Sequence, residues 1–234
     1  MSAITLVNPL PSHIDVVLPT QEVLPDDDGA FMETQRHQWQ VDLLMDLLFP
    51  WLDQRVDGYI GGNMFIDFRK SAGNQHMTGP DVFIVLGVPK GERQSWVVWE
   101  EGKGPDVVIE ILSEQTAKTD KGKKKRIYQD ELQVKEYFWF DPFNAKELAG
   151  FTLQQGIYED KTPDAFGGLV SEVLGLCLVR WHGVYRGVEA TWLRWETLAG
   201  VLLPTAQELA IQAEQQAILQ RWRAEQAEQR VVKL

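Results

Sequence analysis

Residues 105–113 read Pro-Asp-Val-Val-Ile-Glu-Ile-Leu-Ser, a stretch in which Glu110 stands among aliphatic residues. A short apolar run bounded by turn-forming residues predicts a strand that is buried on both faces of a sheet. A charge inside such a strand is costly to bury unless a cation or a hydrogen-bonding partner offsets it. The stretch therefore predicts a central strand and a carboxylate that needs a partner.

A second acidic residue begins another apolar run. Residues 79–86 read Gly-Pro-Asp-Val-Phe-Ile-Val-Leu, so Asp81 opens a strand directly after a proline. A divalent cation held between Asp81 and Glu110 would offset both charges, and oxygen ligands without a Cys/His cluster favour Mg²⁺ or Mn²⁺ over zinc. The competing interpretation is structural: Asp81 caps a turn, and Glu110 pairs with a core lysine or faces solvent.

A helix predicted over residues 115–131 carries a lysine toward these acids. Asp120, Lys124 and Tyr128 recur every four residues, which places them on one helix face. An ammonium group at Lys124 would orient or help to deprotonate an attacking water and neutralise charge in a phosphoryl transition state. The alternative is an exposed Asp120–Lys124 pair, which contributes little to stability.

The same helix holds the densest basic stretch of an acidic chain. The 234 residues have a formal net charge of −11, which disfavours a constitutive, high-affinity nucleic-acid binder. The basic side chains form either a solvated face or a local phosphate-contact surface. On the second interpretation Lys121, Lys123 and Lys125 are the candidate nucleic-acid contacts, and DNA binding is expected to be weak or conditional.

Three segments are expected along the chain. Residues 1–30 contain four prolines and the run Asp26-Asp27-Asp28, which predicts an extended N-terminal arm. Residues 31–200 alternate helical and strand patterns and predict one α/β domain with a mixed sheet. Residues 201–234 are rich in Gln, Glu and Ala, and from Thr205 onward they predict a long helix with a broken apolar stripe, a candidate for pairing two chains.

Finer elements of the domain are predicted from periodicity and turn signals. Leucines at three- and four-residue steps predict a helix over 32–49 that Pro50 ends. Strands are expected at 59–60, 64–68, 96–99 and 137–140, with two or three more over 147–190. No apolar run approaches the ~20 residues that span a bilayer, and no secretory signal pattern is present, so a cytoplasmic protein is expected.

Together these motifs resemble the Uma-two family, a bacterial family assigned as restriction endonucleases. The resemblance lies in residues 79–83, 105–113 and 134–142 and in the Asp120–Lys124–Tyr128 series, and it covers roughly residues 30–185 in order and spacing. It implies membership of the PD-(D/E)XK nuclease superfamily. The implied fold is a restriction-endonuclease-like α/β core, with a central mixed β-sheet flanked by helices, to which this chain adds C-terminal strands and a long C-terminal helix.

The resemblance also implies roles for individual residues. Asp81 and Glu110 match the two acidic metal ligands, and the backbone carbonyl of Ile111 is a further candidate ligand. The superfamily usually places a lysine two residues beyond the second acid; here that position is Leu112, and the family is thought to supply the lysine from the following helix, where Lys124 fits. Glu33 matches an acidic residue that the first helix contributes in related nucleases.

His37, one turn beyond Glu33, either faces the same way as Glu33 or lies on the surface of the first helix, and the surface position is the favoured interpretation. These residues predict a Mg²⁺-dependent endonuclease that acts on DNA, with two copies addressing two strands. The alternatives are a catalytically silent nuclease fold that serves as a binding or assembly module, and a metal-dependent hydrolase of RNA or another phosphoester.

Overall fold

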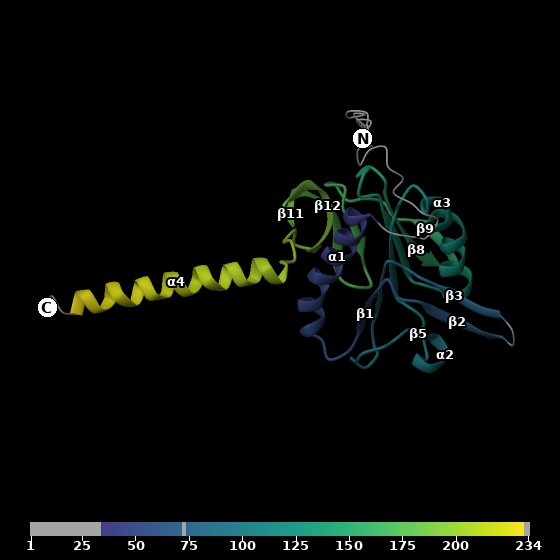
Figure 1. Ribbon diagram of the computed structural model, residues 1–234, viewed down its shortest axis with the longest axis horizontal. Coiled ribbons are helices and arrows are strands. Elements are labelled where there is room, and N and C mark those ends of the chain that lie inside the picture. The colour runs from purple at the N-terminus through teal and green to yellow at the C-terminus, as the bar shows by residue number, and fades with distance from the viewer. Residues whose placement is uncertain (1–33, 72–73, 232–234) are drawn as a thin grey trace, which may run out of the picture. The chain divides into compact units, whose positions relative to one another are not determined.

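The computed structural model describes residues 34–71 and 74–231 (Figure 1), so the arm predicted over 1–30 lies outside the described residues. The elements, in order, are α1 (Gln35–Asp53), β1 (Tyr59–Gly62), β2 (Ile66–Ser71), β3 (Asn74–Thr78), β4 (Val82–Val85), β5 (Trp96–Val97), α2 (Val98–Glu101), β6 (Val107–Ile111), α3 (Ala117–Thr119), the π-helical segments η1 (Asp120–Lys124) and η2 (Ile127–Glu131), β7 (Glu136–Phe140), β8 (Leu148–Gln154), β9 (Ile157–Asp160), β10 (Leu169–Ser171), β11 (Leu176–Tyr185), β12 (Val188–Thr197) and α4 (Ala206–Val231).

A six-stranded mixed sheet forms the centre of the domain, in the order β1-β4-β6-β7-β8-β9. β6 and β7 pair in parallel, whereas the other neighbours in this sheet are antiparallel. Parallel neighbours require a crossover connection, which α3, η1 and η2 provide. Every residue of β4 and of β6 is buried, as the continuous apolar runs predicted. The predicted α/β fold with a central mixed sheet is confirmed.

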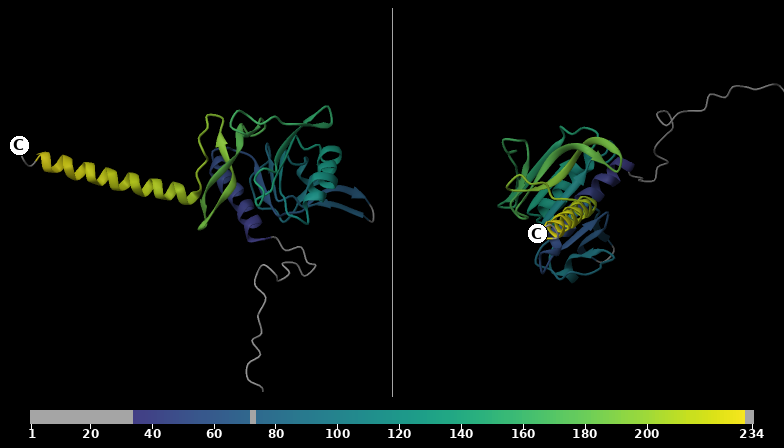
Figure 2. Two further views of the ribbon diagram at one scale, coloured as in Figure 1. Left: turned by 90° about the horizontal axis from the view of Figure 1, so that it is seen from above. Right: turned by 90° about the vertical axis from the view of Figure 1, so that its left-hand side faces the viewer.

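The two faces of this sheet bury different sets of side chains. Val82, Ile84 and Ile109 pack in a cluster with α1 and with the three-stranded sheet β10-β11-β12. Their neighbours Phe83 and Val108 pack in a second cluster, which includes Tyr128 from η2. Because side chains alternate along a strand, both faces are covered and the sheet is a middle layer. Figure 2 shows α1 alongside the β11–β12 hairpin, where Gln40 hydrogen-bonds the backbone of Leu193.

The first helix continues past the proline that was expected to end it. α1 runs to Asp53 with Pro50 inside, so the predicted stop at Pro50 is wrong. The reason is tertiary, because Leu52 is only 7% exposed and packs in the core beside Leu48. Burial of a leucine contributes about 1.5–3 kcal/mol, enough to offset most of the cost of a proline in a helix.

Three further expectations are corrected. The strand predicted over 96–99 ends at Val97, because Val98–Glu101 forms one helical turn closed by Gly102 at φ 80°. The helix predicted over 115–131 is a short α-helical turn followed by two π-helical segments. Five strands, β8 to β12, begin within 147–190 rather than two or three. Among the residues that the structure describes, no helix is both long and apolar enough to cross a membrane.

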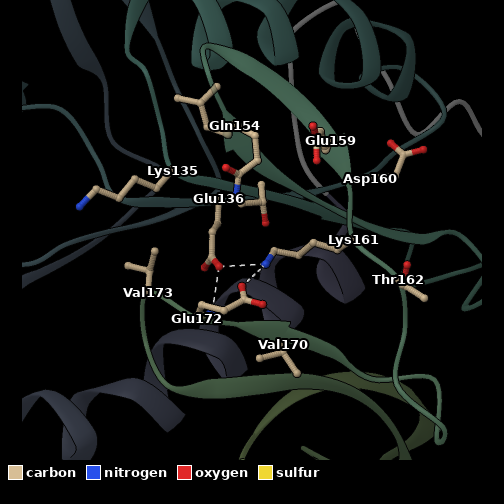
Figure 3. Close-up of a pocket in the computed structure, with 12 residues that line it drawn as sticks. Lys135, Glu136, Gln154, Glu159, Asp160, Lys161, Thr162, Val170, Glu172 and Val173 are labelled. Atoms are coloured by element: carbon tan, nitrogen blue, oxygen red, sulfur yellow. Dashed lines mark hydrogen bonds and ion pairs between the residues drawn. The ribbon is translucent and has the colours of Figure 1, made fainter.

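A buried polar network joins the three-stranded sheet β10-β11-β12 to the six-stranded sheet (Figure 3). Glu136 of β7 is 1% exposed and accepts hydrogen bonds from the Ser171 hydroxyl and, at 2.9 Å, from the Glu172 amide. Lys161 Nζ lies 2.9 Å from Glu136 Oε1 and also contacts Glu172. Burial raises the pKa of Glu136, whereas the hydrogen bond from Ser171 and the Lys161 ammonium lower it and so stabilise its charge.

Asp106 fixes the register of β4 and β6 at the end of the ladder remote from Glu110. Its carboxylate accepts hydrogen bonds from the Leu86 amide at 2.7 Å and from Lys103 at 2.7 Å, and Lys135 Nζ lies 2.8 Å away. Burial alone raises the pKa of Asp106, but the bonds from Lys103, Lys135 and the Leu86 amide outweigh it, so the pKa lies below its ordinary value.

Replacing Asp106 with asparagine is expected to lower the free energy of unfolding by about 1.5–3 kcal/mol at pH 7. The depressed pKa means that the native contribution is present above the unfolded pKa of about 3.9 and is lost as the pH falls through the folded value. Urea unfolding from pH 7 to pH 3 should show the two proteins converging in acid. Asp53→Asn, at a side chain that is 83% exposed, is the control; a pH-independent difference for Asp106→Asn would contradict this account.

Candidate active site

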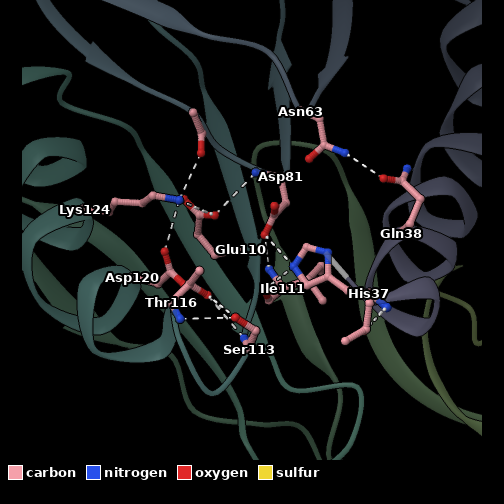
Figure 4. Close-up of polar contacts among 12 residues, drawn as sticks. His37, Gln38, Asn63, Asp81, Glu110, Ile111, Ser113, Thr116, Asp120 and Lys124 are labelled. Carbon is pink, nitrogen blue, oxygen red and sulfur yellow. Dashed lines mark hydrogen bonds and ion pairs between the residues drawn. The ribbon is translucent and has the colours of Figure 1, made fainter. Parts of the chain in front are cut away.

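The pairing of β4 with β6 brings the two predicted acids together. Val82 pairs with Ile109 in an antiparallel register, so the next pair along the ladder is Asp81 with Glu110, on one face of the sheet. The Asp81 amide lies 3.4 Å from Glu110 Oε2, and Asp81 Oδ2 accepts a hydrogen bond of 2.6 Å from the Ile111 amide. Figure 4 shows the Asp81 carboxylate turned toward Ile111 and His37 and the Glu110 carboxylate turned toward Lys124.

Lys124 reaches this pair from the crossover. Its Nζ lies 2.9 Å from the Gly79 carbonyl, 3.1 Å from Glu110 Oε2 and 3.1 Å from Asp120 Oδ1. An ammonium group has three N–H donors, and these three acceptors match them. The structure therefore brings Asp81, Glu110 and Lys124 to one place, although they lie far apart in sequence (Figure 4).

The charges around Lys124 set its protonation state and thereby limit its chemical role. Burial lowers the pKa of Lys124, but the carboxylates of Glu110 and Asp120 outweigh burial and hold the pKa above its ordinary value. The group is thus a stable cation at neutral pH. Of the three roles expected from the sequence, orienting water and neutralising charge fit this state, whereas accepting a proton from water does not.

The π-helical backbone explains why a four-residue spacing forms one face here. The Lys125 amide bonds the Asp120 carbonyl, and the Leu132 amide bonds the Ile127 carbonyl at 3.0 Å, both five residues back. A π-helix has more residues per turn than an α-helix, so side chains four apart remain close to one line. Insertions of this kind occur frequently at functional sites.

Tyr128 lies one turn beyond Lys124 and completes the surroundings of Glu110. Its hydroxyl donates a hydrogen bond of 2.6 Å to Glu110 Oε1 and lies 3.3 Å from Thr78 Oγ1. Burial, and next the Asp81 carboxylate, raise the pKa of Glu110 well above its ordinary value. Glu110 and Asp81 thus share this end of the sheet with one ammonium, and the raised pKa means that the charged form of Glu110 is only partly offset.

His37 is a member of the site that the sequence interpretation placed at the surface. The residue is 1% exposed, and its Nε2 lies 2.7 Å from the Ile111 carbonyl and 3.5 Å from Asp81 Oδ2. A carbonyl oxygen only accepts, so Nε2 carries the proton of this hydrogen bond. His37 therefore fixes the backbone of Ile111 beside Asp81.

A signal for this placement was present in the sequence. His37 precedes Val41, Leu44 and Leu48 by four, seven and eleven residues, which is the spacing of the buried helix face. Thr34, whose hydroxyl accepts a hydrogen bond of 3.3 Å from the His37 amide, caps the helix and sets its first turn.

The remaining site candidates are placed as follows. Lys121 contacts Glu147, and Lys125 Nζ lies 3.3 Å from the centroid of the Phe151 ring, where burial lowers its pKa. Lys123 is exposed and, with Lys118 and Arg126, lines a shallow hollow on the crossover. Glu33 lies outside the described residues, as does the arm predicted over residues 1–30.

Side chains alone would supply only part of the oxygen ligands that a hard cation needs at this site. Among the described residues, no three His, Cys, Asp or Glu side chains form a ready metal cluster. A cation here would be held by Asp81, Glu110 and the Ile111 carbonyl, with water at its other positions. Mg²⁺ commonly keeps several waters and needs only one or two carboxylates, so the oxygen set and its excess negative charge fit this ion.

A match to a family model agrees with the sequence resemblance. A family model named Uma2, described as "Putative restriction endonuclease", matches residues 27–179. A crystal structure described as a putative nuclease belonging to DUF820, from Anabaena variabilis, aligns with a TM-score of 0.43 and 20% identity over 61% of this chain and 75% of that one. None of the curated proteins compared with the chain matches it.

Proposed function

Because this chain belongs to the Uma2 family of restriction endonuclease-like proteins, we propose that it is a metal-dependent endonuclease that hydrolyses DNA phosphodiester bonds. The observation that carries the proposal is the convergence of Lys124 Nζ, 3.1 Å from Glu110, with the carboxylate of Asp81 on the adjacent strand. A buried acidic pair beside a fixed ammonium is suited to holding a cation and to stabilising charge on a phosphoryl group.

In this proposal each residue has a defined task. Asp81, Glu110 and the Ile111 carbonyl hold Mg²⁺ or Mn²⁺, which when bound polarises a phosphoryl oxygen and acidifies a water. The Lys124 ammonium orients that water and neutralises charge that develops on the phosphoryl oxygens. Tyr128 holds Glu110 in place, and His37 does the same for the Ile111 carbonyl.

The proposal also covers DNA binding, oligomeric state and location in the cell. Lys123, exposed one residue from Lys124, contacts the DNA backbone, with Lys121 and Lys125 contributing once DNA displaces their present partners. The net charge of −11 makes this binding weak and sensitive to salt. The enzyme acts as a homodimer in the cytoplasm, where two active sites address two strands.

One observation favours a second candidate, a catalytically silent binding or assembly module. The position that carries the superfamily lysine is Leu112, which is 2% exposed and part of the apolar interior. If Lys124 does not replace that lysine, the acidic chain is a module whose carboxylates serve structure alone. A third possibility is hydrolysis of RNA or another phosphoester. Activity assays on different substrates distinguish it from both candidates.

Asp81→Asn and Glu110→Gln are each expected to lower Mn²⁺ affinity at least tenfold, since a ligand loses its charge while its shape is kept. Calorimetry and the electron paramagnetic resonance signal of Mn²⁺ would measure the loss. Asp130→Asn, at an exposed acid on η2, is the matched control and should bind as the native protein does. Unchanged affinity in both site variants would remove the metal site.

Activity is tested separately, at low salt with each metal, on single-stranded, double-stranded and branched DNA and on RNA. The native protein is expected to cut DNA, and both site variants are expected to be inactive. Metal binding without cleavage of any DNA would favour the silent module, and cleavage of RNA alone would reassign the substrate.

A further inference from the structure

The C-terminal helix α4 carries an apolar stripe that is exposed to solvent. Residues 209–223 are all exposed, and Ile211, Ile218, Leu219 and Trp222 are 46%, 60%, 46% and 57% exposed. At about 100° per residue, these four side chains fall within a sector of roughly 100°, the width of a helix–helix packing face. An apolar stripe along one helix face is the surface through which a helix usually packs against a partner.

The start of α4 is fixed to the domain, so the direction in which the stripe faces is fixed as well. The Glu208 amide donates to Thr205 Oγ1 at 3.1 Å and the Thr205 amide donates to Glu208 Oε2 at 2.7 Å, a reciprocal capping box. Arg194 of β12, itself 3% exposed, binds both carboxylate oxygens of Glu208, at 3.0 and 2.8 Å. The stripe is therefore presented by a helix whose first turn is anchored.

We propose that α4 pairs with α4 of a second copy of this chain in antiparallel orientation. In the register that we infer, Ile211 packs against Trp222 of the second copy, and Gln215 packs against Ile218 of the second copy. The register is symmetric, so each contact occurs twice, as a two-fold dimer requires. This step specifies the surface of the proposed homodimer, and it does not depend on nuclease activity.

The charges beside the stripe favour antiparallel over parallel pairing. Glu214 and Arg221 lie on the same edge of the stripe, and antiparallel helices bring like edges together, so Glu214 faces Arg221 of the second copy. Parallel helices bring opposite edges together and would set Glu214 beside Leu219 and Arg221 beside Gln226 of the second copy. Only the antiparallel arrangement therefore gains two intermolecular ion pairs.

The test exchanges these charges in the full-length protein and measures dimerisation by sedimentation equilibrium. Glu214→Arg and Arg221→Glu are each expected to raise the dimer dissociation constant about tenfold, because each places like charges opposite one another. The double variant Glu214→Arg/Arg221→Glu restores the pairs and should return to within about threefold of the native constant. Circular dichroism checks that helix content is kept.

Arg223→Glu is the matched control, since it makes the same change in charge on the other edge of the stripe. Its dissociation constant should stay within about threefold of the native value. Ile218→Asp should give a monomer. A double variant as weak as the single variants would overturn the antiparallel register, and a native protein that is monomeric at 100 µM, by the same measurement, would overturn the dimer surface itself.

Discussion

Replacement of Lys124 by alanine is expected to lower the rate of DNA cleavage by about 10²–10⁴-fold, with the loss in kcat rather than in KM. The ammonium lies 3.1 Å from Glu110 Oε2, and in the proposed mechanism it neutralises charge on the reacting phosphoryl group. An interaction that strengthens only as charge develops on the phosphoryl oxygens raises kcat. Cleavage of a supercoiled plasmid under saturating metal and DNA would measure this loss.

The neighbouring lysine provides the control. Lys123→Ala removes the same charge from an exposed side chain one residue away, and we expect a higher KM and a weaker salt dependence with kcat changed by less than about threefold. Lys124→Ala also leaves the buried Glu110 without its cation, so unfolding is measured with and without Mn²⁺. A folded, Mn²⁺-binding Lys124→Ala protein that cuts at the native rate would contradict the assigned role.

The convergence of Asp81, Glu110 and Lys124 could be predicted because local patterns define the segments that carry them, and because the family resemblance implies that the two acids lie on adjacent strands. Two apolar runs define β4 and β6, and adjacent strands bring the ends of such runs together. The four-residue series from Asp120 gives the face of the following helix even though that helix is π-helical rather than α-helical. The type of helix could not be predicted, because its hydrogen bonds reach only one residue further than those of an α-helix.

His37 shows why the rest of the site was missed. The spacing of His37 places it on the buried face of α1, but a polar residue near a helix start usually faces solvent. The partner that makes its burial favourable, the Ile111 carbonyl, is brought close only by the packing of α1 against the sheet. The length of α1 and the strand content of residues 147–190 were missed for the same reason. Both depend on contacts with β10–β12 that are distant in sequence, and local propensity does not contain them.

Removal of the Lys161 ammonium by Lys161→Met is expected to lower the free energy of unfolding by about 3–5 kcal/mol at pH 7. The Lys161 side chain is 7% exposed and its Nζ lies 2.9 Å from the carboxylate of Glu136, which is buried between the two sheets (Figure 3). The substitution leaves that carboxylate charged, buried and without its cation. Urea unfolding followed by tryptophan fluorescence would measure the loss.

The loss should come from the uncompensated charge rather than from the missing side chain. A second substitution, Glu136→Gln, keeps an acceptor for the Glu172 amide and a group that can bond the Ser171 hydroxyl, so the double variant should recover most of the stability. Lys146→Met removes an ammonium from an exposed side chain and should cost less than about 1 kcal/mol.

The pH dependence of the free energy of unfolding also distinguishes an uncompensated charge from lost packing. Burial already raises the pKa of Glu136 in the native protein, and loss of Lys161 raises it more. A carboxyl with a raised folded pKa destabilises the folded state above that pKa and ceases to do so once it is protonated. The deficit of Lys161→Met should therefore shrink as the pH falls from 7 toward 5. A loss of unfolding free energy that stays constant over this range, or that Glu136→Gln fails to reduce, would instead indicate lost packing between the two sheets.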